Sequence, residues 1–280
     1  MSVSRRLPRA LLTACAVVAC LLGLPGPAPA AAAGAAVACT DATLVFARGS
    51  GQPLGAGEVT RFFSASLAAL AARPVGTYEL GTHAQGAARY PAVGVGTDST
   101  EAFLTMIGAD LSWTGLGSYR ASVAQGVAET AAYLSARSAL CPGERFVLSG
   151  YSQGAHVIGD ALAGLAPALR ARVAYVALFG DPKLHLPEGK GIVPPACRGG
   201  SRSPWRRGSA GCLVDSGILE ARVPYVPADL AGRVGSWCDS GDAVCTNNLA
   251  AFRNTAHSAY DLPGKGVDQA ATEIAAALAR

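Results

Sequence analysis

The stretch "FVLSGYSQGAHVIGDAL", residues 146–162, combines three local signals in direct succession. Its first residues form an apolar run, which predicts a buried strand. The G-Y-S-Q-G segment predicts a sharp turn around Ser152, and the apolar residues after it recur at helical spacing. Strand, turn and helix in this order are the setting in which a serine can be exposed as a nucleophile. Gly150 and Gly154 supply the small residues that such a turn needs two positions before and after the serine.

Elements of alternating type continue on both sides of this stretch. Strands are predicted at 42–49, 75–80, 145–152, 171–181 and 232–238, and helices at 57–72, 118–140, 153–165 and 267–279. Strands that alternate with helices indicate a mostly parallel sheet with helices on both faces. The sequence therefore predicts the α/β class, as a three-layer α/β/α sandwich with a mostly parallel central sheet.

The first residues of the chain have the pattern of a secretory signal. Three arginines precede an apolar stretch from about residue 10 to residue 24, and small residues follow near position 30. This order predicts a signal peptide over residues 1–30. The apolar run is short for a membrane span, and no later stretch offers about 20 consecutive apolar residues. We expect an exported protein without a stable membrane span, and anchoring as a lipoprotein at Cys20 remains open.

The rest of the chain, residues 31–280, reads as one domain. It is long enough for a full core and shows neither an internal repeat nor a low-complexity linker. Without the signal it carries 20 basic and 19 acidic residues, a balance that does not support a nucleic-acid partner or a strongly charged substrate. We expect a monomer.

Six cysteines follow the predicted signal peptide: Cys39, Cys141, Cys197, Cys212, Cys238 and Cys245. An even number in an exported chain predicts three disulfides. Short spacing favours Cys238 with Cys245 and Cys197 with Cys212, which leaves Cys39 with Cys141. No C-x-x-C or H-x-x-x-H spacing occurs in the sequence, so we do not expect a metal site.

An irregular segment at about 183–232 separates the last two predicted strands. It is rich in Pro, Gly and Arg, and the Cys197–Cys212 pair would staple it. A loop of this length in a compact domain is usually functional or disordered. The staple favours an ordered insert.

A serine nucleophile needs a base, and the chain contains four histidines. His257 follows the last predicted strand, and the order serine, acid, histidine that accompanies this type of turn selects it as the base. His156 lies one helical turn beyond the serine and points poorly at its hydroxyl. His83 and His185 are interpreted as surface or packing residues.

The acid that orients the base has two candidates. Asp242 lies in "CDSGDAVC", where a Cys238–Cys245 bridge would hold a short loop rigid. Asp181 directly follows the apolar run "VALFG" (176–180), but Asp before Pro182 is also typical of a turn. We favour Asp242.

Four separated motifs, "CTDATLVFARGS", "CPGERFVLSGYSQGA", "WCDSGDAVCTNN" and "HSAY", together resemble the cutinase family of secreted serine esterases, which includes acetylxylan esterases. The resemblance spans residues 38–260. It implies a small α/β-hydrolase with no large lid and a serine that solvent can reach, and the acyl transfer expected of such a serine requires no cofactor. It also implies that Ser152 is the nucleophile, Asp242 the acid and His257 the base, with Ser50 and the backbone N–H of Gln153 as the oxyanion hole. The long insert departs from the family pattern and leaves the substrate open.

Three functions are compatible with these observations. The first is a secreted carboxylester hydrolase acting on acyl esters of lipids, polyesters or short-chain substrates. The second is an esterase of glycan or cell-envelope esters, such as acetylxylan or mycolyl esters. The third is an exported, non-catalytic envelope-binding protein, whose basic residues would be those of the insert: Arg198, Arg202, Arg206 and Arg207.

Overall fold

The computed structural model describes residues 38–71, 73–94, 117–184, 217–219, 222–239, 242–246 and 255–280. The structural statements below concern these residues. The predicted signal peptide, the predicted Cys197–Cys212 staple and most of the predicted insert lie outside them.

A five-stranded sheet in the order β2-β1-β3-β4-β5 forms the centre of the domain, and every neighbouring pair of strands is parallel. The strands are β1 (Ala42–Ala47), β2 (Val75–Glu79), β3 (Arg145–Tyr151), β4 (Val173–Phe179) and β5 (Val234–Trp237). All residues of β1, β4 and β5 are buried. Strands in a parallel sheet are covered on both faces, which explains their continuous apolar sequences.

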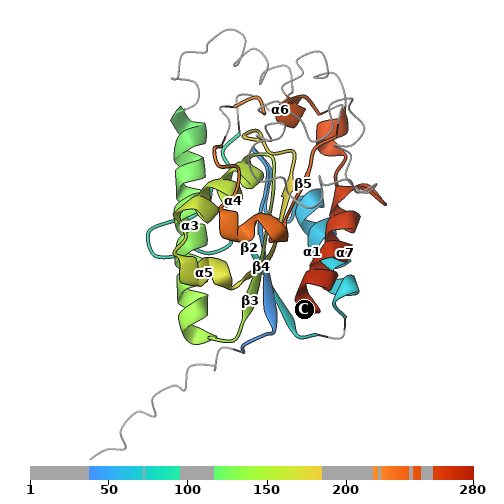
Figure 1. Cartoon of the computed structure of the whole chain (residues 1–280). Coiled ribbons are helices and arrows are strands. Elements are labelled where there is room, and N and C mark those ends of the chain that lie inside the picture. Colours follow the sequence, from blue (N-terminus) through green and yellow to red (C-terminus); the bar gives the residue numbers. More distant parts are fainter. Residues whose placement is uncertain are drawn as a thin grey trace, which may run out of the picture. The chain divides into compact units, whose positions relative to one another are not determined.

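Helices cover both faces of this sheet, as Figure 1 shows, with α3, α4 and α5 on one face and α1 and α7 on the other. The helices are α1 (Gly57–Ala69), α3 (Gly117–Leu140), α4 (Gln153–Gly164), α5 (Pro167–Ala171), α6 (Ala243–Thr246) and α7 (Gly266–Leu278), with short 3₁₀ turns η3 (Ala228–Arg233) and η5 (Thr255–Ser258). The predicted three-layer α/β/α fold is confirmed. Among the described residues, no helix combines the length and apolarity needed to cross a bilayer.

The sheet separates two cores because successive strand residues point to opposite faces. Val45 and Leu148 pack in the core beneath α3 and α4. Phe46 and Val147 pack in the core beneath α1 and α7, where Phe46 contacts Phe62 with ring centroids 5.1 Å apart. The alternation places each strand's side chains in both cores.

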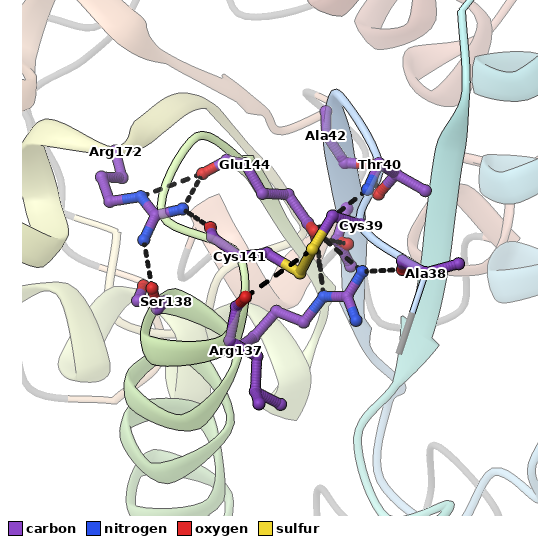
Figure 2. The surroundings of a disulfide bond; sticks show 11 residues. Ala38, Cys39, Thr40, Ala42, Arg137, Ser138, Cys141, Glu144 and Arg172 are labelled. Carbon is purple, nitrogen blue, oxygen red and sulfur yellow. Dashed lines mark hydrogen bonds and ion pairs between the residues drawn. A yellow bond between two sulfur atoms is a disulfide. The ribbon is translucent and has the colours of Figure 1, made fainter. Parts of the chain in front are cut away.

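The disulfide between Cys39 and Cys141 ties the start of β1 to the end of α3 (Figure 2). Beside it, Arg137 forms an ion pair of 2.8 Å with Glu144, whose side chain is fully buried. Arg172 donates hydrogen bonds to the Ser138 and Cys141 carbonyls. This pole of the domain, at the amino ends of the strands, is thus held by one covalent and several polar contacts.

The described ends of the predicted insert pair with each other. The Gly217 N–H donates to the Leu184 carbonyl at 2.7 Å, and the Leu219 N–H donates to the Pro182 carbonyl at 2.9 Å. The Ile218 N–H donates to the Val244 carbonyl at 2.8 Å, which joins the returning segment to α6. Residues 182–184, where the chain enters the insert, and residues 217–222, where it returns, are therefore joined by backbone hydrogen bonds and form the base of the insert.

Arg222 anchors this base with a buried guanidinium that faces two carboxylates. Its Nη1 lies 2.9 Å from Asp181 Oδ2, and its Nε lies 2.7 Å from Asp160 Oδ1 on α4. Burial alone would lower the pKa of Arg222, but the two carboxylates raise it overall. Burial would likewise raise the pKa of Asp160, but hydrogen bonds and charges from His156 and Arg222 hold it well below the usual value.

The Cys39–Cys141 disulfide closes a loop with a sequence separation of 102, whereas Cys238 and Cys245 are separated by 7. In the chain-entropy account, the longer loop restricts the unfolded state more. We expect Cys39→Ser with Cys141→Ser to lower the free energy of unfolding by about 4 to 5 kcal/mol, and Cys238→Ser with Cys245→Ser by about 2 kcal/mol. Urea unfolding of both double variants measures this, and equal losses would contradict it.

Removing the buried cation at the base of the insert leaves two carboxylates without their partner. We expect Arg222→Met to lower the free energy of unfolding by about 3 to 5 kcal/mol at pH 7. Arg170→Met, which removes a more exposed pair with Asp229, is the matched control and has a much smaller effect.

The loss caused by Arg222→Met also depends on pH, because Asp160 has a lowered pKa in the folded state. A lowered carboxyl pKa contributes stability above its unfolded value of about 3.9, and this contribution disappears as pH falls. The difference in the free energy of unfolding between wild type and Arg222→Met is therefore largest above about pH 5 and becomes smaller in more acid solution. A constant difference from pH 7 to pH 3 would contradict the assignment.

Candidate active site

The predicted site residues gather at the carboxyl ends of the parallel strands. Ser50 follows β1, Ser152 follows β3, and Asp242 follows β5. The strand order reverses between β1 and β3, and open α/β sheets bind ligands beyond the carboxyl ends at such a point. The two serines lie on either side of it.

Ser152 occupies a tight turn that only its small neighbours permit. Its φ is 54° and its ψ is −117°, a conformation that L residues rarely adopt. A Cβ at position 154 would lie 1.9 Å from the Ala47 carbonyl oxygen, and one at position 150 would lie 2.3 Å from the Gly154 oxygen. The two glycines are therefore sterically required, as the sequence pattern indicated.

Ser152, His257 and Asp242 form a hydrogen-bonded series. His257 Nε2 lies 3.0 Å from Ser152 Oγ, and His257 Nδ1 lies 2.8 Å from Asp242 Oδ2. The Tyr151 ring packs against the imidazole with centroids 5.0 Å apart. The serine is partly exposed and the aspartate is fully buried, so one end of the series meets solvent and the other lies in the domain.

The Asp242 carboxylate lies in the loop that the Cys238–Cys245 disulfide closes. The Val244 N–H donates to its Oδ1 at 2.8 Å, and the Tyr260 hydroxyl donates to its Oδ2 at 2.6 Å. Burial alone would raise the pKa of Asp242, but the charge and hydrogen bond of His257 and the other two donors hold it below the usual value. The structure thus favours the ionised form.

The other acid and the other histidines have different partners. Asp181 accepts hydrogen bonds from Arg222 and from the Lys183 N–H. His156 contacts the Tyr119 hydroxyl at 3.1 Å and Asp160 at 3.0 Å, and its burial lowers its pKa despite that carboxylate. The His83 carbonyl oxygen lies 3.1 Å from the Tyr78 hydroxyl, and His185 lies outside the described residues.

Ser50 and Gln153 lie together. The fully buried Gln153 side chain donates through Nε2 to Ser50 Oγ at 3.0 Å and to the Val93 carbonyl at 3.0 Å. The Gln153 N–H belongs to the first turn of α4, where N–H groups lack a partner within the helix. The Gln153 side chain thus joins the turn after β3 to the segment after β1.

Sequence reasoning missed the residues that hold Gln153 and Asp242 in place. Gln153 Oε1 accepts hydrogen bonds from Tyr90 and Ser122, which come from the segment after β2 and from α3. Tyr260 is the last residue of the quoted "HSAY" motif, and its spacing of three residues from His257 was the available signal. Tyr90 and Ser122 lie in no motif, so their sequence offers no such signal.

Known proteins resemble this chain in sequence and in fold. Carboxylesterase Culp1 of Mycobacterium tuberculosis is 35% identical over 167 residues, which cover 59% of this chain and 63% of that protein. Phospholipase Culp4 of the same organism is 29% identical over 282 residues, covering 97% of this chain and 92% of that protein. The chain thus spans somewhat less than two thirds of Culp1.

The fold has counterparts among solved structures. A cutinase-like protein from Cryptococcus sp. is similar with a TM-score of 0.57 and 23% identity, over 85% of this chain and 95% of that one. The family model described as Cutinase matches residues 38–278, which include all of the candidate site residues. This chain therefore belongs to the cutinase family.

Proposed function

We propose that this chain is a secreted serine carboxylester hydrolase that acts through Ser152, His257 and Asp242. The observation that carries the proposal is the series of hydrogen bonds from Ser152 Oγ through both nitrogens of His257 to Asp242 Oδ2. A serine hydroxyl becomes an effective nucleophile when a base of this kind accepts its proton. Membership of the cutinase family supports the same reaction class.

In the proposed reaction, His257 Nε2 accepts the Ser152 proton while Oγ attacks the ester carbonyl. Asp242 holds the Nδ1 proton of the base and stabilises the imidazolium that forms. The imidazolium then protonates the departing alcohol, and an acyl-enzyme remains on Ser152. Water then attacks the acyl carbon while His257 accepts its proton, and His257 returns that proton to Ser152 Oγ as the bond to the acyl group breaks and the acid leaves. Only protons and an acyl group move, so the reaction requires no metal ion or organic cofactor.

The Gln153 N–H and Ser50 are proposed as the donors for the oxyanion. Because Ser50 Oγ accepts a hydrogen bond from Gln153 Nε2, its own proton can be donated to a substrate oxygen. Two preorganised donors stabilise the charge that develops on the carbonyl oxygen. The buried bonds of the Gln153 side chain keep both donors in one arrangement.

Acyl esters of lipids are the proposed substrate class, with polyesters and short-chain esters as chemically related substrates. The alignment with the phospholipase Culp4 over 97% of this chain supports lipid esters. Two disulfides and the signal pattern of residues 1–30 support export. Esters of glycans or of the cell envelope are the alternative substrates.

Hydrolysis of 4-nitrophenyl esters from acetate to palmitate tests the nucleophile. We expect Ser152→Ala to lower kcat by about 10⁴- to 10⁶-fold because the covalent step is lost. Ser64→Ala, an exposed serine on α1, is the matched control and should retain wild-type activity. A preference for long acyl chains supports lipid esters, and a preference for acetate supports deacetylation of glycans. A folded wild-type protein without activity on any ester would favour the envelope-binding function.

The two candidate acids can be separated with isosteric variants. We expect Asp242→Asn to lower kcat by about 10⁴-fold, because the amide no longer holds the reactive tautomer of His257. Asp181→Asn should leave kcat close to the wild-type value and lower the melting temperature, because Asp181 pairs with buried Arg222. The reverse ranking of the two kcat values would assign the acid to Asp181.

A further inference from the structure

Tyr260 contacts the candidate acid on the oxygen that already binds the base. Its hydroxyl lies 2.6 Å from Asp242 Oδ2, which also lies 2.8 Å from His257 Nδ1. The second carboxylate oxygen, Oδ1, accepts the Val244 N–H. A phenol and an imidazole thus share one oxygen of a buried carboxylate.

The direction of the Tyr260 hydrogen bond follows from its neighbours. The Asp239 N–H, which can only donate, points to the Tyr260 oxygen at 3.0 Å. An ionised carboxylate can only accept, so the single hydroxyl proton of Tyr260 is directed to Asp242. The hydroxyl therefore stabilises negative charge on Oδ2.

The Tyr260 ring is fixed as firmly as its hydroxyl. The residue is 3% exposed, and its ring lies 6.1 Å from Phe179 and 6.2 Å from Tyr151 between centroids. Its oxygen lies 3.6 Å from the sulfur of Cys245, in the disulfide that closes the acid loop. Tyr260 therefore has little room to reorient, as expected for a side chain that holds the Asp242 carboxylate in place.

We propose that Tyr260 is the positioning residue of the acid: its hydroxyl fixes the orientation of Asp242 Oδ2 toward His257 and keeps the buried carboxylate ionised. The inference rests on the proposed function of the triad. Without this bond, the carboxylate can rotate away from the imidazole. The free-energy cost of burying its charge is then offset by one fewer hydrogen bond.

The charged and titratable groups around the pair come from several segments, among them α1, where the Glu58 carboxylate interacts electrostatically with His257. His257 and Tyr260 lie on the segment 255–260, Asp239 follows β5, and Tyr151 ends β3. Lys265 lies 3.9 Å from Asp239. Of these groups, His257 and Tyr260 donate hydrogen bonds to the Asp242 side chain. If Tyr260→Phe changes how stability depends on pH, we therefore assign the change to the Asp242 carboxylate.

Tyr260→Phe removes the hydroxyl and keeps the ring. We expect kcat to fall about 10-fold while KM stays unchanged, because the acid is less often oriented for the base. Tyr78→Phe is the matched control: it removes a buried phenol that donates to Glu129 at the same distance of 2.6 Å, away from the triad. It should lower stability and leave kcat close to the wild-type value.

Unfolding measured between pH 3 and pH 8 tests the proposal without any substrate. Tyr260 helps to lower the pKa of Asp242, and a lowered carboxyl pKa contributes stability above about pH 4 that is lost in acid. The stability difference between wild type and Tyr260→Phe should therefore be largest above pH 5 and shrink below it. A difference independent of pH would show that the hydroxyl serves packing alone and would overturn the proposal.

The remaining outcomes are also decisive. A kcat within twofold of wild type in folded Tyr260→Phe overturns the proposal. If wild type hydrolyses no ester, the proposed function fails, while the unfolding series still tests Tyr260.

If Tyr260→Phe does not fold, 3-fluorotyrosine at position 260 provides a second test, because it keeps the shape of the side chain and its hydroxyl is a stronger hydrogen-bond donor. The acid-induced loss of stability should then move to lower pH, and an unchanged profile overturns the proposal.

Discussion

The start of α4 passes so close to the end of β1 that no side chain fits between them. The Gly154 backbone lies against the Ala47 and Arg48 carbonyls, and a Cβ there would overlap the Ala47 oxygen. This contact brings the turn after β3 beside the turn after β1. Gln153, the residue after Ser152, can therefore reach Ser50, and its side-chain amide donates a hydrogen bond to the Ser50 hydroxyl oxygen. A bulkier residue at position 154 would separate the proposed nucleophile from its proposed oxyanion donors.

The acid side of the site depends on a different kind of constraint. The described residues between Cys238 and Cys245 are held by hydrogen bonds and by a covalent bond. The Cys238–Cys245 disulfide closes the loop after β5, and backbone and phenolic donors hold both oxygens of Asp242. A rigid turn thus presents the serine, and a cross-linked loop presents the carboxylate. His257 lies between two parts that are fixed independently.

The sequence was informative where local chemistry determines structure. Among the described residues, apolar runs and helical spacing predicted all five strands and the four long helices, because each is set by its own residues. The strand predicted at 171–181 is shorter, Val173–Phe179, because α5 ends at Ala171 and Gly180 has a φ of 58°. The Ser-His-Asp assignments lie in recognisable motifs. The bonds of Gln153 to Tyr90 and Ser122 join distant segments, and no local pattern encodes them.

The buried Arg222 is the clearest case of a contact that local patterns do not reveal. In the sequence it is one more arginine in a basic, irregular segment, and only the fold shows that it faces Asp160 and Asp181. Its charge is matched by partners on α4 and after β4, more than 40 residues before it in the chain. Pairing of this kind depends on topology rather than on neighbours in sequence.

The hydrogen bonds at the base of the insert fix the positions of its two ends. Backbone bonds between 182–184 and 217–222, together with the Arg222 ion pairs, return the chain to the same point whatever lies between them. The 185–216 stretch is thus a natural graft point. We expect a sequence exchanged there to keep these backbone bonds, and the bond from Ile218 to Val244 places the junction two residues from Asp242. Libraries built at this junction would alter the surroundings of the acid without redesigning the sheet.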